Sequence, residues 1–392
     1  MTTPRTHHPA AADPSCPIRP LIGATAPASA TCRFTQGPAS VTLRTDHAEL
    51  LTDAEATLYS YARTTTAASR WTITVHTSAR VDQVGAAALF ADADDHDIGP
   101  NLQAQSIGVP GGRAFWIRAH ATLVHLDEMS GTITVYAGDL DAARFFSARL
   151  VRQAMTAQLL EHDAVYAHAA ALVHADHGLL IAGPKGAGKT TTLLSTLRLV
   201  GGDFVTNDRL LLRLEPGGPG TVGHAWPMHL RATASTLRAV PGMNRFLPAE
   251  QRTEQGSPSG KIAIEPGDLR AALPTTQIRG ELQPTLMLWP YRSDQDRPPE
   301  PVPTAEVRDV LVRTQFFMHD PVTRTTSHRN HWLLPPDHDR TALALSAVAD
   351  QLARTVPCVR IPVTDSPAAL AARVTGLLDQ PATRPTGPGG RR

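Results

Sequence analysis

A glycine-rich loop that fits the phosphate-binding pattern is the strongest chemical signal in the chain. Residues 183–190 read Gly-Pro-Lys-Gly-Ala-Gly-Lys-Thr and match GxxxxGK(S/T) at every fixed position. An apolar run leads into the loop and a helical run follows it, which is the context that the pattern requires. Glycines let backbone N–H groups approach phosphate oxygens, Lys189 can reach the outer phosphates, and the Thr190 hydroxyl can bind Mg²⁺. The loop therefore predicts binding of a nucleoside triphosphate together with Mg²⁺.

Lysine is nearly absent from the rest of the chain. It occurs only at Lys185, Lys189 and Lys261, and the other 34 of the 37 basic residues are arginine. Arginine replaces lysine on a solvated surface but not where a compact ammonium is required, so we expect Lys189 to contact phosphate. Lys185 either adds charge near the phosphates or points to solvent, and Lys261 is either a further phosphate contact or a surface residue. The predicted nucleotide contacts are Gly183, Pro184, Lys185, Gly186, Ala187, Gly188, Lys189, Thr190 and Thr191.

Two polar positions near the loop in sequence are further candidates. A short predicted strand, 204–206, ends in Asn207-Asp208-Arg209. A carboxylate at such a strand end can manage Mg²⁺ or an attacking hydroxyl, although Asn-Asp is also good turn chemistry. His168 opens an apolar stretch fifteen residues before Gly183. Taken alone, the pattern favours a functional Asp208 and a half-buried structural His168.

Together these segments resemble the catalytic domain of HPr kinase/phosphorylase and its relatives, a group similar in fold to ATP-dependent phosphoenolpyruvate carboxykinase. The family pattern has a histidine that opens a strand, a second strand leading into GxSGxGKS, a helix, and a strand that ends in Asp-Asp-Arg. The resemblance covers residues 165–215. It implies a P-loop kinase core of the HPr kinase type, with ATP and Mg²⁺ as cofactors. It also implies catalytic roles for His168, Asn207, Asp208 and Lys189, and Mg²⁺ ligation by Thr190 and Asp208.

The chain departs from that family pattern at two positions. Lys185 stands where the family has serine, and Asn207 stands where the family has the aspartate that acts as base toward the acceptor hydroxyl. An amide cannot accept a proton at neutral pH. Asp208 takes the role of base, or Asn207 only positions the acceptor, or catalysis relies on positioning and charge alone. The departure also weakens the expectation of the reverse, phosphorolytic activity.

These features predict a kinase whose acceptor is a hydroxyl of a peptide, a protein serine or a small molecule. The alternatives are a nucleotide-dependent switch or an ATPase with a degenerate kinase site. The 392 residues carry a net charge of +1, which argues against nucleic acid as a partner. No apolar run is long enough to span a membrane, no secretory signal is evident, and three widely spaced cysteines fit a cytoplasmic protein. A homo-oligomer is compatible with the sequence.

Periodicity predicts an α/β chain with a smaller N-terminal α/β domain. We expect a disordered tail at 1–35, an N-terminal domain for acceptor or partner recognition at 36–160, a nucleotide-binding domain at 161–380 and a second tail at 381–392. Predicted strands are 41–44, 71–76, 113–118, 122–126, 131–136, 165–174, 179–182, 204–206, 210–214, 285–289 and 358–363. Predicted helices are 48–63, 139–163, 190–200, 266–272, 304–313, 340–354 and 367–378. The acidic run 92–97 and the stretches 215–223, 250–260 and 297–303 are predicted loops, and the pairs His120/His125 and His328/His331 show no convincing metal-ligand set.

Overall fold

A computed structural model describes residues 16–64, 69–77, 80–99, 102–248, 260–313, 316–320, 325–326 and 332–379. The predicted loop at 250–259, the tail from residue 381 and the pair His328/His331 lie outside these residues. The chain divides into two compact units. Unit 1 comprises Met1–Glu161 with His328–Pro336, and unit 2 comprises His162–Ser327 with Asp337–Arg392. Both combine helices with sheets, which confirms the α/β class. In the described part of the chain, no helix is both long and apolar enough to cross a membrane.

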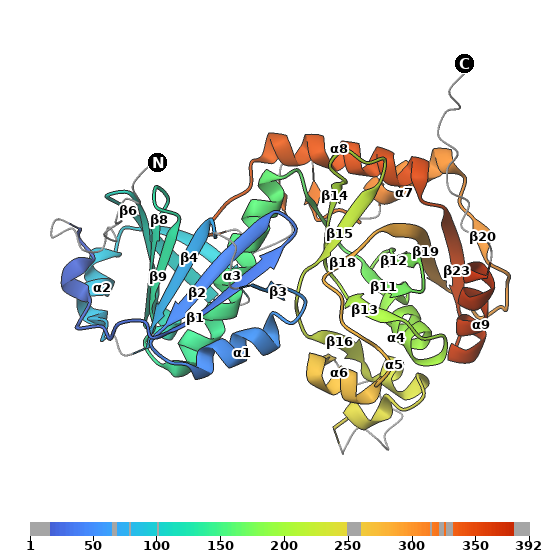
Figure 1. The fold of residues 1–392 in the computed structure, drawn as a ribbon, viewed down its shortest axis with the longest axis horizontal. Helices are drawn as coiled ribbons and strands as arrows, with labels where there is room; N and C mark the ends of the chain where they lie inside the picture. Colours follow the sequence, from blue (N-terminus) through green and yellow to red (C-terminus); the bar gives the residue numbers. More distant parts are fainter. Residues whose placement is uncertain are drawn as a thin grey trace. The chain divides into compact units, whose positions relative to one another are not determined.

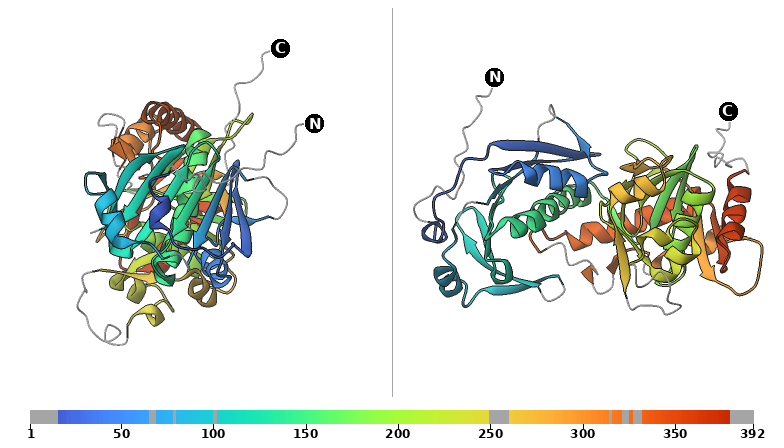
Figure 2. Two further views of the ribbon diagram at one scale, coloured as in Figure 1. Left: turned by 90° about the vertical axis from the view of Figure 1, so that its left-hand side faces the viewer. Right: turned by 90° about the horizontal axis from the view of Figure 1, so that it is seen from below.

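Unit 1 is built on a nine-stranded sheet of order β3-β1-β2-β4-β9-β8-β7-β6-β5. Its strands are β1 (Ala30–Gln36), β2 (Ala39–Thr45), β3 (Ala62–Arg63), β4 (Trp71–His76), β5 (Asp94–Gly99), β6 (Leu102–Val109), β7 (Gly112–Ile117), β8 (Thr122–Asp127) and β9 (Thr132–Tyr136). Its helices are α1 (Glu49–Thr57), α2 (Gln83–Leu89) and α3 (Leu140–Glu161). The strands predicted at 113–118, 122–126 and 131–136 are confirmed as β7, β8 and β9, with antiparallel register throughout. The long helix α3, drawn in green, lies along the sheet in Figure 1 and in the right-hand view of Figure 2.

Three predictions for unit 1 were wrong. Residues 16–35 of the tail expected at 1–35 are structured: Cys16, Ile18 and Leu21 are buried against α2, and β1 begins at Ala30. The signal was missed because a few apolar residues can pack without forming a visible period. The acidic run predicted as a loop forms the edge strand β5, where aspartates tolerate strand geometry because their side chains remain in solvent. The helix expected over 48–63 ends at Thr57 and is followed by β3, which pairs with β1.

Unit 2 contains two larger sheets and six α-helices among its described residues. The six-stranded sheet has the order β13-β11-β12-β19-β23-β20, and the four-stranded sheet has the order β10-β14-β15-β18. The strands are β10 (Val165–Ala167), β11 (Ala170–His174), β12 (His177–Ile181), β13 (Asp203–Thr206), β14 (Leu210–Leu214), β15 (Thr221–Ala225), β16 (Leu230–Thr233), β17 (Lys261–Ile264), β18 (Glu281–Leu282), β19 (Pro284–Arg292), β20 (Glu300–Pro301), β21 (His319–Asp320), β22 (Thr325–Thr326) and β23 (Cys358–Val363). The helices are α4 (Lys189–Leu199), α5 (Ala234–Ala239), α6 (Pro266–Ala272), α7 (Thr304–Arg313), α8 (His338–Thr355) and α9 (Pro367–Leu378).

The core of unit 2 lies between its two sheets and is closed by helices. Leu180 and Val205 of the six-stranded sheet share one buried cluster with Leu212 of the four-stranded sheet and Val348 of α8. Helix α8 packs on the four-stranded sheet, and α4 packs with α9 beside the six-stranded sheet (Figure 1). The helices predicted at 266–272, 304–313 and 367–378 are confirmed at their predicted bounds.

The single strand predicted at 165–174 is two strands in different sheets. β10 pairs with β14, whereas β11 pairs with β12 and β13, so the chain passes from one sheet to the other at His168 and Ala169. The backbone N–H of His168 donates to Phe316 O at 2.6 Å. The prediction was wrong because the break is set by this distant contact and not by a glycine or proline in the run.

Candidate functional site

The six-stranded sheet brings three of the predicted segments to one edge. β13, β12, β19 and β23 run parallel to one another, and β11 runs antiparallel to them. The start of β11 therefore lies beside the ends of β12 and β13, with Ala170 opposite Ile181 and Ala171 opposite Thr206. His168 precedes β11, Gly183 follows β12 and Asn207 follows β13. Their shared edge is the carboxyl edge of the parallel strands, where α/β proteins place their ligands.

The glycine loop, Gly183–Gly188, connects β12 to α4 with three glycines in conformations that other residues avoid. The φ angles are 144° at Gly183, 86° at Gly186 and 106° at Gly188. At Gly188, which is the N-cap of α4, a Cβ atom would lie 3.0 Å from a methyl carbon of Val363, so a side chain would clash as well as strain the backbone. At Gly186 the space where a Cβ would project is empty to 4 Å. The loop thus forms an open backbone cradle at the positive end of a helix, which suits an anion such as phosphate.

The Lys189 ammonium lies inside this loop. Its Nζ donates to Gly183 O at 2.7 Å and to Pro184 O at 3.2 Å, and the residue is 8% exposed. Burial lowers the pKa of Lys189 to about 8; the Asp208 carboxylate opposes this effect and the Lys261 charge adds to it. The ammonium is therefore held by two carbonyl oxygens, which the oxygens of a bound phosphate can replace as its hydrogen-bond acceptors.

Nucleotide affinity should fall as the pH rises through about 8. Bound phosphate raises the pKa of Lys189, so below about 8 the lysine is charged with or without ligand and the affinity is constant. Above about 8 the protein must take up a proton to bind, and the affinity falls by up to about tenfold per pH unit. Calorimetric titration with a non-hydrolysable ATP analogue between pH about 7 and about 10, in buffers of different ionisation enthalpy, measures both affinity and proton uptake. Constant affinity across this pH range would contradict a contact between the Lys189 ammonium and the bound phosphate.

His168 and Asp208 meet at the same edge. His168 Nε2 lies 3.1 Å from Asp208 Oδ1, and each side chain is about 30% exposed. Burial acts to raise the pKa of Asp208, but the hydrogen bond from His168 and nearby cations outweigh it and hold that pKa at about 2. The nearby cations are Arg209 and Lys261. Asp208 is therefore ionised at neutral pH, with one oxygen engaged by the imidazole.

Asn207 is buried, with 4% of its surface exposed, and one of its two amide groups makes no hydrogen bond within the described residues. Its Nδ2 donates to Arg231 O at 3.3 Å, in strand β16, which pairs with β17. Its Oδ1 has no hydrogen-bond partner among the residues that the structure describes. Because buried polar atoms in folded proteins nearly always have a partner, this oxygen is suited to accept a hydrogen bond from a bound hydroxyl or amine.

The other predicted contacts fall into two groups. Thr190, in the first turn of α4, makes no hydrogen bond through its hydroxyl within the described part of the chain, and Lys185 is exposed at the tip of the loop. Thr191 Oγ1 lies 3.0 Å from Thr236 Oγ1, which commits this hydroxyl to α5. Lys261 begins β17 and is near enough for its charge to act on both Lys189 and Asp208. Of these residues, Thr190 and Lys261 are placed to face a ligand in the loop.

Arg292 is a candidate that the sequence patterns missed. It ends β19, at the same carboxyl edge, and its Nε donates to Gly186 O at 3.2 Å. No signal marks it in the sequence, because the chain is rich in arginine and the end of β19 lies far from the glycine loop along the chain. Its guanidinium adds a further cation beside the predicted phosphate site.

The residues present fit a Mg²⁺–nucleotide complex better than a metal ion alone. Among the described residues, no three His, Cys, Asp or Glu side chains converge as a metal site. Magnesium in nucleotide sites is held by one or two protein oxygens together with phosphate oxygens and water. The Thr190 hydroxyl and the Asp208 carboxylate are such oxygens.

Comparisons with known proteins find only a distant structural likeness. No family model matches the chain, and no curated protein matches it. Among solved structures, the Hpr(Ser) kinase/phosphatase from Coxiella burnetii aligns over 54% of this chain and 95% of that chain. The alignment has 14% sequence identity and a TM-score of 0.25. A likeness at this level supports no conclusion about activity, so the functional argument rests on the residues of this chain.

Proposed function

We propose that this protein is an ATP- and Mg²⁺-dependent phosphotransferase that acts on a hydroxyl group. The observation that carries the proposal is the convergence of the glycine loop, the buried Lys189 ammonium and the ionised Asp208 at one sheet edge. Phosphoryl transfer requires cations around the phosphates and a group that orients the attacking oxygen, and little covalent work from the protein. The acceptor is a hydroxyl of a peptide, a protein serine or a small molecule.

Each residue of the site has a part in this reaction. The amides of residues 183–188 bind the phosphates, and Lys189 neutralises charge as the bond to the γ-phosphorus breaks. Asn207 Oδ1 accepts a hydrogen bond from the acceptor hydroxyl and so orients its oxygen toward phosphorus. The hydroxyl proton passes to Asp208, which His168 positions. When bound, Mg²⁺ would neutralise phosphate charge, held by Thr190 and Asp208.

Asn207 favours a second candidate, a nucleotide-dependent switch or an ATPase. An amide cannot take the acceptor proton, and Asp208 serves His168 and, in our proposal, the metal. If no group removes that proton, the site binds nucleotide without transfer. Under either function we assign recognition of the acceptor or partner to unit 1.

Acceptor-dependent release of ADP tests the proposal directly. The full chain is incubated with Mg²⁺ and ATP, with and without serine-containing peptides and hydroxylated small molecules, and ADP is measured along with phosphorylated product. A phosphotransferase should release ADP in proportion to the acceptor phosphorylated. ADP and free phosphate without any acceptor would establish an ATPase, and tight binding with no turnover across the acceptor panel would establish a switch.

A further inference from the structure

A cavity of unit 2 lies at the edge of the six-stranded sheet opposite the glycine loop. It is lined by Val173, near the end of β11, and Gly178, near the start of β12. The glycine loop and His168 flank the other ends of the same strands. A five-residue strand is roughly 15 Å long, so this cavity is separate from the candidate nucleotide site. Its volume of about 570 Å³ is in the range of small-molecule sites.

Two arginines present guanidinium groups to the cavity in defined orientations. Arg213 Nε donates to Nε2 of the buried His224 at 3.0 Å, and Arg279 Nε donates to Asp203 Oδ2 at 2.6 Å. Both bonds use the inner nitrogen of the guanidinium. The terminal N–H groups of both arginines have no other hydrogen-bond partner in the described ranges. Guanidinium groups held in this way bind carboxylates through two parallel hydrogen bonds.

Carboxylates lie in the same cavity and argue against a simple anion as its ligand. Glu215 and Glu281 follow Arg213 and Arg279 by two residues, a spacing that directs side chains to the same face of extended backbone. Glu281, 47% exposed, lies 2.9 Å from His224 Nδ1, close but not aligned as a hydrogen bond. Glu215 Oε1 accepts from Gln283 Nε2 at 3.2 Å. Together with the exposed Asp176, three carboxylates and two guanidinium groups line the cavity. The carboxylates would repel a simple anion, whereas a ligand that carries both charges is attracted by groups of both signs.

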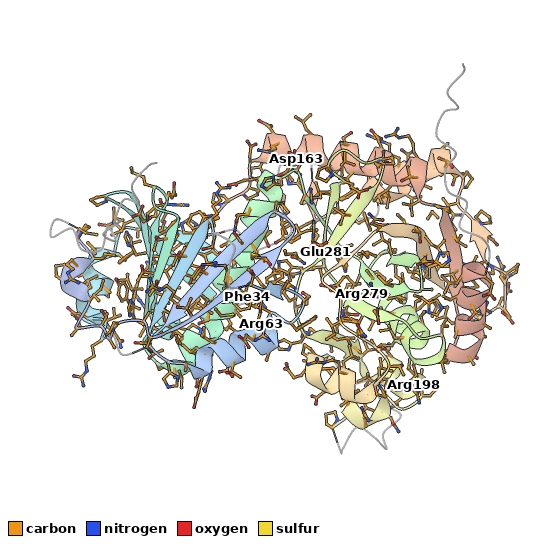
Figure 3. The ribbon with its side chains drawn as sticks, viewed as in Figure 1. Phe34, Arg63, Asp163, Arg198, Arg279 and Glu281 are labelled. Atoms are coloured by element: carbon orange, nitrogen blue, oxygen red, sulfur yellow. The ribbon has the colours of Figure 1, made fainter. Side chains whose placement is uncertain are left out.

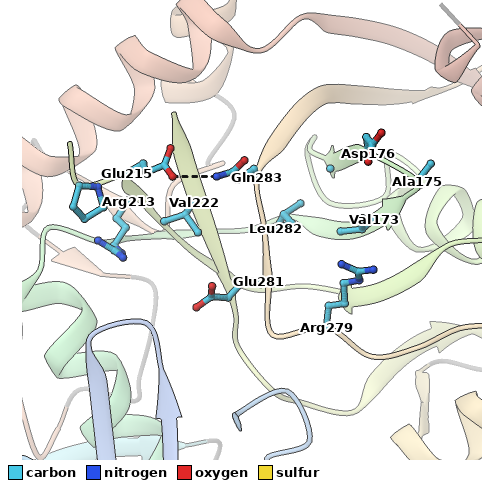
Figure 4. A pocket seen from close by; sticks show the side chains of 12 residues that line it. Val173, Ala175, Asp176, Arg213, Glu215, Val222, Arg279, Glu281, Leu282 and Gln283 are labelled. Carbon is cyan, nitrogen blue, oxygen red and sulfur yellow. Dashed lines mark hydrogen bonds between the residues drawn. The ribbon is translucent and has the colours of Figure 1, made fainter. Parts of the chain in front are cut away.

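Apolar side chains separate the charged groups of this cavity. Figure 4 shows Val222, Leu282 and Val173 in a row, with charged side chains on both sides of that row. Two of the charged residues, Arg279 and Glu281, are carried by the segment that leads into β19, and both are labelled in Figure 3. Arg279 and Asp176 lie beside the Val173 end of the row, and Arg213, Glu215 and Glu281 lie nearer the Val222 end (Figure 4). A ligand that matches this lining has an apolar body, a carboxylate at the Arg279 end and an ammonium at the end with the two glutamates.

We propose that this cavity binds a short peptide with free ends and apolar side chains. Arg279 takes the terminal carboxylate, Glu215 and Glu281 take the terminal ammonium, and the apolar row takes the side chains. A single amino acid would leave much of the volume empty, whereas two or three residues span from one charged group to another. The proposal is independent of the nucleotide site and of the phosphotransferase function.

Calorimetric titration of the full chain with the dipeptide leucylleucine tests this proposal. We expect binding that weakens by about tenfold or more when the amino end is acetylated, and similarly when the carboxyl end is amidated. Arg279→Gln should weaken binding of the free acid and leave binding of the amide unchanged. Glu281→Gln should weaken the free dipeptide and leave the acetylated form unchanged. Arg270→Gln, an exposed change on α6 outside the cavity, should alter none of these affinities.

The comparison of free and blocked peptides needs no variant, so a misfolded variant cannot obscure the result. Equal affinities for the free, acetylated and amidated dipeptides would overturn the proposal, because neither charged end would then be recognised. The absence of binding by all three at millimolar concentration would overturn it as well. Circular dichroism and thermal unfolding of each variant show whether the chain is folded.

Discussion

Lys189→Ala should reduce phosphoryl transfer by about 10²- to 10³-fold, the usual loss when one preorganised charge-stabilising group is removed from a reaction centre. The ammonium lies among the loop carbonyls, bonded to Gly183 O and Pro184 O, and no other lysine of the loop is buried. Removing it leaves the phosphates to the loop amides and to more distant cations. Nucleotide affinity should fall together with turnover. Both are measured by calorimetry and by ADP release.

A loss of activity in this variant is informative only if the fold persists. Lys189 is not part of the buried apolar cluster that joins the two sheets of unit 2, so circular dichroism and thermal unfolding should stay close to those of the unaltered protein. Arg297→Ala removes an exposed cation that bonds only to Gln295 in the described structure and serves as the matched control. Unchanged ATP affinity and turnover in Lys189→Ala would show that the loop does not bind phosphate.

The glycine loop and its flanking elements could be predicted because their signals are contiguous in the sequence. An apolar strand, three glycines and an amphipathic run stand side by side, so β12 and α4 needed no tertiary information. Helix α9 begins at Pro367 after the capping residue Ser366, and its predicted start was correct for that local reason. The convergence of His168 with Asp208 could be expected only through the family resemblance, because no local pattern contains the pairing of β11 with β13.

What escaped prediction depends on contacts between distant segments. The break at His168 is fixed by a hydrogen bond to Phe316, and Arg292 reaches the loop only because β19 pairs with β12. Asn207 Nδ2 is held by Arg231 O, which leaves Oδ1 without a partner among the described residues. Side-chain types were visible in the sequence, but their partners were not. The candidate site was therefore predictable at the level of the glycine loop, and much less so at the level of individual hydrogen bonds.

Asn207 and Asp208 stand where the resembling family has two aspartates, and the two residues offer the acceptor different chemistry. Asp208 is held ionised by His168 and the surrounding cations, and a carboxylate with a pKa of about 2 binds Mg²⁺ well but is a weak base. Asn207 offers an acceptor oxygen without a charge. The site thus favours positioning over proton removal, a division that a loose transition state tolerates.

Asp208→Asn should reduce phosphoryl transfer by about 10²- to 10⁴-fold, because it removes the one carboxylate that the described site offers to the acceptor proton and the metal. The two roles separate by binding: if Asp208 mainly serves the metal, Mg²⁺ will no longer tighten ATP, and if it mainly serves as base, ATP and Mg²⁺ binding will survive. Asn207→Asp should keep or raise activity, since it adds a second carboxylate where Oδ1 now lies without a partner in the described residues. Asp379→Asn, an exposed change at the end of α9, is the control. Full activity in Asp208→Asn would disprove both roles and would assign the proton to His168 or to the transferred phosphate itself.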